Sequence, residues 1–164
     1  KAYDSAWVAL AYDDKNLYVA FRCFDPNPDS IIMKSPKTLR DSIKGADDQM
    51  KFYFTPSRDV DSVYYQANFT AGGAIKDLRF AMEKGEFDGH FEWNGVSECA
   101  VQKTKTGFEG EAALPWKNMG LSKPGPMRIN FRHGSARFDK KGGRYAYQEI
   151  WDVDPKTYSE APLR

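Results

Sequence analysis

The sequence predicts an all-β fold: an antiparallel β-sandwich of the immunoglobulin or jelly-roll type with very little helix. Three observations lead to this prediction. About eight segments alternate apolar and polar residues with a period of two, as strands with one buried face do. Turn residues separate these segments at regular intervals. Aromatic residues make up 15% of the chain, including 9 Tyr and 11 Phe, and such side chains favour strands.

The first two predicted strands form a hairpin. Residues 7–12 and 17–24 alternate, and the tetrapeptide 13–16, Asp-Asp-Lys-Asn, connects them. Asp and Asn favour turns because their side chains accept hydrogen bonds from the backbone that follows and tolerate positive φ. The segment 25–29, Asp-Pro-Asn-Pro-Asp, then ends the second strand, because proline cannot donate to a sheet. We therefore interpret these aspartates as turn formers and strand terminators.

The middle of the chain predicts one loop and two strands. Residues 31–44 are charged and irregular, as in a loop that holds at most one helical turn. Residues 49–55 (QMKFYFT) and 63–70 (VYYQANFT) both alternate and are predicted to pair. The stretch 77–89 is polar and poorly patterned, so no strand is predicted there.

The second half of the chain predicts further strands and one helical turn. Residues 115–120 begin with Pro and end with Gly, which is typical of a short helical turn. The last residues, 152–164, show no period and are predicted to be irregular. The strands predicted in this half cover residues 91–93, 97–103, 108–114, 127–133 and 145–151.

Length, charge and hydropathy limit the class of protein. The 164 residues suit one domain, residues 1–164. With 24 basic and 23 acidic residues the net charge is +1, which argues against a nucleic-acid partner. The apolar runs fall well short of the ~20 residues of a membrane span. The chain begins with Lys1 rather than Met, so we expect a processed or excised piece of a larger protein.

No pattern in the sequence points to catalysis, and we predict no enzyme. The two histidines, His90 and His133, are expected at the surface or in loops, without the nucleophile and orienting acid of a triad. Glu109 and Glu111 share one strand face, and a solvated face explains them better than the separated carboxylates of a glycosidase. No phosphate-binding glycine pattern occurs.

The sequence does not decide whether the cysteines form a disulfide or whether the aspartates bind calcium. Cys23 and Cys99 lack a CxxC spacing and are either one disulfide or two buried thiols. Aspartate pairs such as Asp13-Asp14 and Asp47-Asp48 offer the hard oxygen ligands that calcium takes. Turn chemistry accounts for these aspartates better, but one structural calcium ion remains an alternative, and no other cofactor is predicted.

A surplus of aromatic residues and a set of polar strand faces predict a binding surface. Exposed aromatic rings present an apolar face on which a sugar ring can stack, and amide and charged side chains can hydrogen-bond its hydroxyl groups. The polar faces of the central predicted strands carry such side chains. We therefore assign ligand binding to six residues: Lys51, Gln66, Asn130, Arg132, Trp151 and Tyr158.

Five segments, in order, resemble the family 9 carbohydrate-binding modules. LAYDDKNLYVAFRCFDP resembles the early hairpin of that family, with its YDD-x-x-LYV pattern and following Asp-Pro. The segments DDQMKFYFTP, YYQANFTAGG, GFEGEAALPWKNMG and MRINFRH are similar to later strands, and the five span residues 6–151. The resemblance implies a non-catalytic β-sandwich, related to the DOMON group and found in secreted bacterial polysaccharide-degrading proteins.

The resemblance also implies a site for a terminal sugar between two tryptophans, and this sequence departs from it. Gly45 and Ala46 stand where the first tryptophan is expected, before the DDQM strand. Tyr158 is the nearest aromatic residue to the second, in the last loop. The polar positions of the family site correspond to Lys51, Gln66 and Arg132. The scaffold therefore carries over, and the two-tryptophan site does not match.

Three functions are compatible with these observations. The first is binding of an oligo- or polysaccharide on a concave sheet face, in a secreted or cell-surface protein of bacterial type with further domains. The second is a structural or docking domain of a cell-surface protein that binds no sugar. The third is a haem-binding module, because DOMON relatives hold haem through Met with His or Lys. Met50 and Met127, however, lie on apolar strand faces and are interpreted as core residues.

Overall fold

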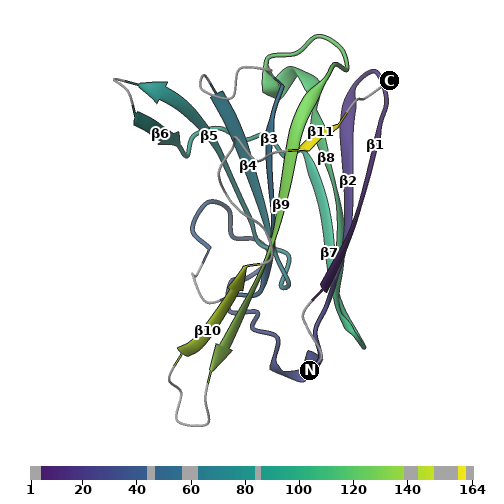
Figure 1. The fold of residues 1–164 in the computed structure, drawn as a ribbon, viewed down its shortest axis with the longest axis vertical. Coiled ribbons are helices and arrows are strands. Elements are labelled where there is room, and N and C mark those ends of the chain that lie inside the picture. Colours follow the sequence, from purple (N-terminus) through teal and green to yellow (C-terminus); the bar gives the residue numbers. More distant parts are fainter. Residues whose placement is uncertain are drawn as a thin grey trace.

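A computed structural model describes residues 5–43, 47–56, 63–83, 86–138, 144–149 and 159–161. Within these residues the chain forms eleven strands and two short 3-10 helices. The strands make two antiparallel sheets that face each other across the molecule (Figure 1). The predicted all-β sandwich with very little helix is confirmed. No helix in the described ranges is long and apolar enough to cross a membrane.

The smaller sheet has four strands in the order β1-β2-β8-β7. These are β1 (Ser5–Tyr12), β2 (Asn16–Phe24), β7 (Glu98–Thr104) and β8 (Gly107–Pro115). All of them match strands that the alternating pattern predicts, to within one or two residues. In this sheet one face is apolar and turned inward, so its register follows from the pattern.

Aspartate side chains form the turns of the first hairpin, as predicted. Oδ1 of Asp13 accepts the backbone N–H groups of Lys15 and Asn16 at 2.8 and 2.7 Å. These two bonds hold the pKa of the Asp13 carboxyl below its usual range. After β2, Oδ1 of Asp25 accepts the N–H of Asn27 at 2.7 Å. The aspartates that flank the hairpin therefore have backbone partners.

The larger sheet runs in the order β10-β9-β3-β4-β5-β6, and β11 also pairs with β9. The sheet lies opposite the smaller one along most of the molecule (Figure 1). Its strands are β3 (Gln49–Thr55), β4 (Val63–Thr70), β5 (Ile75–Glu83), β6 (Glu86–His90), β9 (Met127–Phe138), β10 (Arg144–Glu149) and β11 (Ser159–Ala161).

Three sequence predictions about this half of the fold are wrong. Residues 77–89 contain most of β5 and β6, residues 91–93 form a turn rather than a strand, and β11 lies in the stretch predicted to be irregular. In β5 the inward positions include Asp77 and Arg79, opposite core residues of β4. Two charged residues on the inward face hide the period of two, so the pattern is lost although the strand is present.

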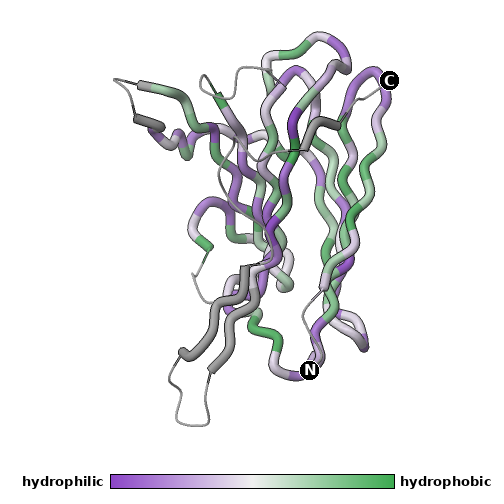
Figure 2. Tube along the Cα trace, viewed as in Figure 1, coloured by the Kyte–Doolittle hydropathy of each residue, from purple (hydrophilic) through white to green (hydrophobic). Residues whose placement is uncertain are grey.

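The inward faces of both sheets form one core rich in phenylalanine. The ring of Phe21 lies 5.8, 5.7 and 6.1 Å from the rings of Phe52, Phe69 and Phe108, so β2, β3, β4 and β8 meet there. Figure 2 shows the alternation of apolar and polar residues along these strands. Met50 and Met127 are buried in this cluster, which confirms their interpretation as core residues.

The two cysteines are thiols and do not form a disulfide, which decides between the two alternatives. Cys23 pairs in register with Phe108 and Cys99 with Ala112, so the two thiols lie at different levels of the smaller sheet. Burial raises the pKa of the Cys99 thiol to about 11. At neutral pH this thiol is therefore protonated and packs as a small apolar side chain.

One of the two histidines is not where it was expected. His133 is buried, with its ring edge-on to Phe108 at 5.8 Å. It extends the inward series of β9 by one more alternate position, after Ile129 and Phe131, and so belongs to the core face. His90 lies at the end of β6, where its Nδ1 is 3.0 Å from a carboxylate oxygen of Glu92.

Two short 3-10 helices complete the fold: η1 (Pro28–Ser30) and η2 (Trp116–Met119). The second is the helical turn predicted after the Pro at the end of β8. It ends at Gly120, whose φ of 73° is the left-handed conformation that glycine adopts most readily.

Candidate functional site

A row of polar side chains crosses the outer face of the larger sheet. Lys51 on β3 pairs in register with Arg132 on β9 and with Asn68 on β4, and Asn68 pairs with Lys76 on β5. Residues opposite each other on antiparallel strands have neighbouring side chains. We call these four residues the cationic row, because three of them carry a positive charge.

A second row lies beside the cationic row, two residues along each strand. Tyr53 pairs with Asn130 on one side and with Gln66 on the other, and Gln66 pairs with Leu78. We call these four residues the amide row. The side-chain Nε2 of Gln66 donates to Oδ1 of Asn68 at 2.9 Å, which links the two rows.

The two rows contain four of the six residues predicted to bind ligand: Lys51, Gln66, Asn130 and Arg132. These four come from three different strands, and the sheet places them on one face within two adjacent rows. The other two predicted residues, Trp151 and Tyr158, lie outside the described residues.

This face is not a solvated strand face. Asn68 is 4% exposed, Tyr53 5% and Leu78 3%. Lys51 and Arg132 are half-buried. A side chain with this degree of burial has lost much of its hydration, so its hydrogen-bonding groups contribute more to any contact they make.

Aromatic rings flank the rows on the same face. The rings of Tyr64 and Phe80 are stacked, with centroids 4.5 Å apart and planes inclined by 10°. Nζ of Lys76 lies 4.9 Å from the ring centroid of Phe91, within the range of a cation–π contact. Burial and the neighbouring Tyr53 raise the pKa of Tyr64 to about 12, so this phenol stays protonated.

Sequence reasoning missed the contribution of β5 to this face. Lys76, Leu78 and Phe80 occupy every second position there, and all three lie on the outer face. The apolar residues Leu78 and Phe80, two positions apart, are the sequence feature that indicates this strand. Charged residues between and beside them make the whole stretch polar on average, so the strand was not predicted.

The cationic row lowers the pKa of its central lysine. Burial removes hydration from the Lys51 ammonium group, and the charges of Arg132 and Lys76 repel it, so its pKa falls from 10.5 to about 8. A folded-state pKa below the unfolded one means that the unfolded chain binds more protons between these two values. The stability contributed by this residue therefore rises as the pH increases from about 8 to about 10.5.

Substitution of this lysine tests the depressed pKa. Lys51→Met should raise the free energy of unfolding at pH 7 and should flatten its increase between pH 8 and 10.5, measured by urea unfolding at a series of pH values. Lys117→Met, at an exposed lysine of η2, is the matched control and should keep the wild-type slope. Equal slopes for the wild type and Lys51→Met would contradict the assignment.

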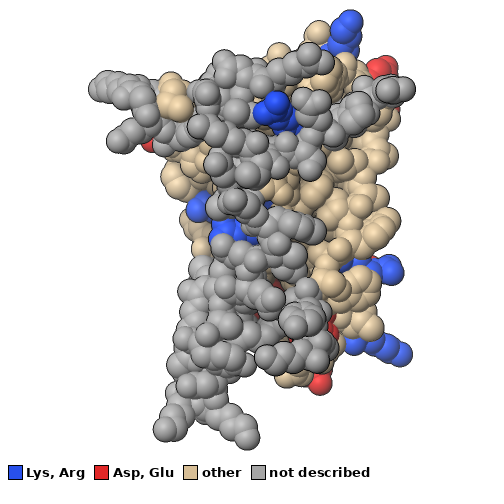
Figure 3. Space-filling model, viewed as in Figure 1, with Lys and Arg blue, Asp and Glu red and all other residues tan. Residues whose placement is uncertain are grey.

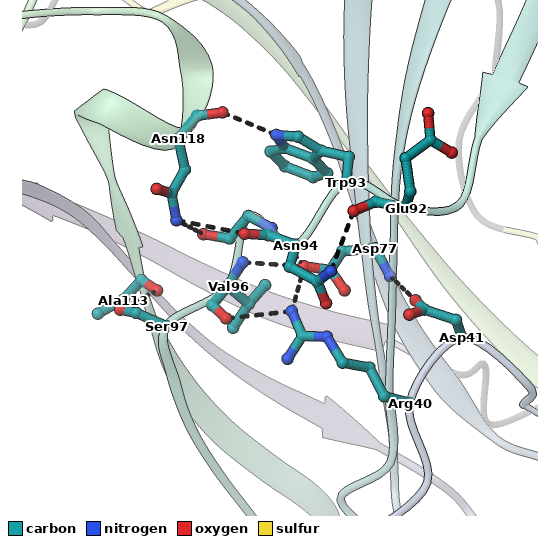
Figure 4. Close-up of polar contacts among 11 residues, drawn as sticks. Arg40, Asp41, Asp77, Glu92, Trp93, Asn94, Val96, Ser97, Ala113 and Asn118 are labelled. Atoms are coloured by element: carbon teal, nitrogen blue, oxygen red, sulfur yellow. Dashed lines mark hydrogen bonds and ion pairs between the residues drawn. The ribbon is translucent and has the colours of Figure 1, made fainter.

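A buried carboxylate on the inward face of β5, opposite to the face of the cationic row, holds the loop after β6 in place. Oδ2 of Asp77 accepts hydrogen bonds from the N–H groups of Gly95 and Val96 at 2.6 and 2.9 Å and pairs with Nη2 of Arg40 at 2.5 Å (Figure 4). Oδ1 of Asp41 in turn accepts the N–H of Asp77. The network ties loops on either side of β5 to that strand.

Desolvation and hydrogen bonding shift the pKa of the Asp77 carboxylate in opposite directions. Burial raises the pKa of Asp77, and the hydrogen bonds from Val96 and Gly95 together with the charge of Arg40 act to lower it. The position next in sequence, Lys76, belongs to the cationic row, so the network also determines where β5 lies at the candidate site.

The aspartates at the start of β3 also have structural roles. Asp47 accepts the N–H groups of Lys34 and Ser35, both at 2.8 Å, and Asp48 accepts that of Ile32 at 2.7 Å. Both are buried. Their oxygens thus hold the preceding loop against the sheet. Within the described ranges no group of three or more His, Cys, Asp or Glu side chains is arranged to hold a metal ion. The structural calcium ion stays the alternative to turn chemistry, and the structure does not test it.

The fold and this face together define a two-sheet β-sandwich that presents amide, cationic and aromatic side chains on the outer face of one sheet. Solved structures of the same architecture exist. A Bacteroides uniformis protein assigned as carbohydrate-binding is 10% identical, with a TM-score of 0.69, and the match covers 97% of this chain and 78% of that one.

Two further structures show a family 9 carbohydrate-binding module from Caldicellulosiruptor kristjanssonii. The complex with glucose is 17% identical, with a TM-score of 0.58, and the match covers 100% of this chain and 78% of that one. The complex with cellotriose is 16% identical, with a TM-score of 0.56, and covers 99% and 76%. The chain therefore has the fold of family 9 carbohydrate-binding modules. No protein-family model and no curated protein matches its sequence.

Proposed function

We propose that this chain is a non-catalytic carbohydrate-binding module and that the half-buried side chains of the cationic and amide rows bind an oligo- or polysaccharide. The observation that carries the proposal is the convergence of Lys51, Gln66, Asn130 and Arg132 on one half-buried face. Donors and acceptors from several strands, held in fixed positions beside aromatic rings, are the composition of a site that orients a ligand. The shared fold with glucose- and cellotriose-bound modules supports this choice of ligand.

The site combines hydrogen-bond donors and acceptors, which suits the recognition of sugar hydroxyl groups. Lysine and arginine donate several hydrogen bonds and accept none, whereas the amides of Gln66 and Asn130 do both. Oδ1 of Asn130 already accepts the N–H of Phe131 at 2.8 Å, which directs its amide NH2 group toward other partners. A sugar hydroxyl, which both donates and accepts, can satisfy neighbouring groups of both kinds.

We also propose where the protein acts and what it is attached to. Polysaccharides are met outside the cell, so we propose a secreted or cell-surface location and attachment to further domains that act on or display the polysaccharide. The chain itself supplies binding and no catalytic step.

Calorimetry against a panel of glycans tests the proposed function. We expect glucose, cellotriose or a plant polysaccharide to bind the wild type. Lys51→Met and Arg132→Met should each weaken that binding about tenfold or more, because a hydrogen bond to a charged group contributes roughly 1.5–3 kcal/mol. Lys117→Met should bind as the wild type does.

Failure of all glycans to bind would contradict the proposal and favour the docking-domain alternative. Normal binding by both variants, with their fold verified by circular dichroism, would instead show that the sugar binds away from the two rows.

A further inference from the structure

On the smaller sheet, too, a row of side chains crosses the outer face. Trp7 on β1 pairs in register with Arg22 on β2, Arg22 with Glu109 on β8, and Glu109 with Gln102 on β7. We call these four residues the tryptophan row. It spans all four strands and faces away from the core.

The polar members of the tryptophan row form a fixed hydrogen-bonding unit. Nε and Nη2 of Arg22 lie 2.7 and 2.6 Å from Oε2 of Glu109, and Nε2 of Gln102 donates to Oε1 of the same carboxylate at 2.9 Å. The bonds from Gln102 and Arg22 lower the pKa of Glu109, so it is ionised at neutral pH. The guanidinium and the amide each carry further N–H donors, and both side chains are exposed to a ligand on this face.

Trp7 stands at one end of this unit with 56% of its surface exposed, more than the other large apolar side chains of the described residues. Tryptophan is enriched at binding interfaces, because its ring combines a large apolar surface with an N–H donor. The indole therefore offers a flat apolar platform next to groups that can hydrogen-bond the same ligand.

Two adjoining hollows lie beside the tryptophan row. One, of about 440 Å³, is lined by Trp7, Arg22, Gln102 and Glu109. The other, of about 560 Å³, continues from it over β1, β2, β7 and β8. The two share the lining residues Ala20, Ala100 and Glu111.

The hollow exists because the row next to the tryptophan row consists mostly of alanines, whose side chains are short. That row pairs Ala9 with Ala20, Ala20 with Glu111, and Glu111 with Ala100. Three of its four side chains are alanines and Glu111 is the one long side chain among them, so the row leaves a trough, which we call the alanine trough. Its far wall is formed by Tyr18 and Glu98. Figure 3 shows a mostly uncharged (tan) surface along the right-hand side of the molecule, where β1 and β2 lie in Figure 1.

The dimensions of the trough favour a thin occupant. Its two walls are four residues apart along the strands, or roughly 13 Å between backbones, and the wall side chains narrow this further. An α-helix with its side chains is about 10–12 Å wide and does not reach the floor. Addition of a strand requires a sheet edge, and the trough lies in the middle of a sheet face.

The charges of the trough favour an uncharged, hydroxylated occupant. Glu98 and Glu111 line it in addition to Glu109, and Arg22 is the basic residue among its lining side chains. This excess of carboxylates repels acidic ligands. Hydroxyl groups donate to carboxylates and accept from guanidinium and amide groups, so a neutral saccharide satisfies both kinds of partner.

We propose that the outer face of the smaller sheet is a second saccharide-binding site, in which an uncharged glycan chain stacks on Trp7, hydrogen-bonds the Arg22–Glu109–Gln102 unit and lies in the alanine trough. The inference goes beyond the proposed function and does not depend on it, because the two faces lie on different sheets. With both faces occupied, one chain would hold two glycan segments, which raises its retention on a polysaccharide without any new contact.

Affinity electrophoresis of the whole chain tests the second site. The probes are neutral polysaccharides (hydroxyethylcellulose, xyloglucan, laminarin and dextran) and the acidic polygalacturonate. We expect retardation by at least one neutral probe and none by polygalacturonate. Trp7→Ala should weaken the association about five- to tenfold, the size expected for loss of one aromatic contact.

Two further variants separate binding from folding. Ala100→Gln fills the trough at an exposed position, leaves the tryptophan row intact and should also weaken retardation. Met33→Ala removes a comparable exposed apolar side chain, 43% exposed, from a loop outside the trough and should behave as the wild type.

The outcomes also distinguish this inference from the proposed function. Loss in Trp7→Ala and Ala100→Gln, with normal retardation in Lys51→Met and Arg132→Met, supports the second site whatever the larger sheet does. Wild-type retardation of both trough variants on every probe that binds overturns it. Absence of retardation by all neutral probes, or retardation by polygalacturonate that Trp7→Ala abolishes, overturns it as well.

Discussion

Asp77→Ala is expected to lower the free energy of unfolding by about 3–5 kcal/mol, because it removes the buried partner of the partly exposed Arg40 and the acceptor of two buried N–H groups. The carboxylate has no exposed side-chain surface, and a single oxygen holds Arg40 and two buried backbone N–H groups. Alanine leaves the N–H groups of Gly95 and Val96 without an acceptor, and each unsatisfied buried group costs about 1–3 kcal/mol. Urea unfolding measures the change.

Two variants show whether the loss comes from this network. Asp77→Asn retains an acceptor oxygen of similar shape and should cost clearly less than alanine. Glu92→Ala breaks an exposed pair with His90 in the same region and should leave the unfolding midpoint unchanged, because solvent screens such pairs. A loss below about 1 kcal/mol for Asp77→Ala would show that water replaces the network without penalty.

Trp116→Ala is expected to lower the free energy of unfolding by about 3–5 kcal/mol through the cavity it leaves. Trp116 is 1% exposed and lies edge-on to Tyr12, with ring centroids 6.5 Å apart. Its Nε1 donates to the carbonyl oxygen of Asp13 at 2.8 Å, and its backbone N–H donates to that of Lys15 at 2.9 Å. The residue therefore joins the first hairpin turn to the end of β8, about a hundred residues later in the chain.

Comparison of substitutions separates the contributions of this tryptophan. Trp116→Phe keeps most of the packing and loses one hydrogen bond, so it should cost about 1–2 kcal/mol, clearly less than alanine. Trp7→Ala, at the exposed tryptophan of β1, should change stability by no more than about 0.5 kcal/mol. Similar losses for Trp116→Ala and Trp7→Ala in urea unfolding would contradict the placement of Trp116 in the core.

The strands were predicted correctly where one face of the strand is apolar and the other carries polar groups. In β2 buried positions alternate with exposed or half-buried ones, and in β3 apolar residues alternate with residues that carry a polar group, so the period of two is visible. It failed in β5, where Asp77 and Arg79 face inward. A charged residue can occupy an inward position only when partners far away in sequence satisfy it, and no local pattern records those partners.

The candidate site was predicted in part for the same reason. Lys51, Gln66, Asn130 and Arg132 lie on strands whose alternation was recognised, so their shared face followed from the pattern. Lys76 lies on β5 and was missed. The depressed pKa of Lys51 could not be predicted either, because it arises from burial and from charges on two other strands.

The sequence by itself determined most of the strands, the hairpin turns and the face on which most strand residues lie, because these depend on neighbours within a few positions. Only the tertiary structure decided the order of the strands, and with it which residues share a row. The cationic row joins β9, β3, β4 and β5, and the tryptophan row joins β1, β2, β8 and β7. Register between strands distant in sequence places these side chains beside one another, and both proposed binding faces depend on it.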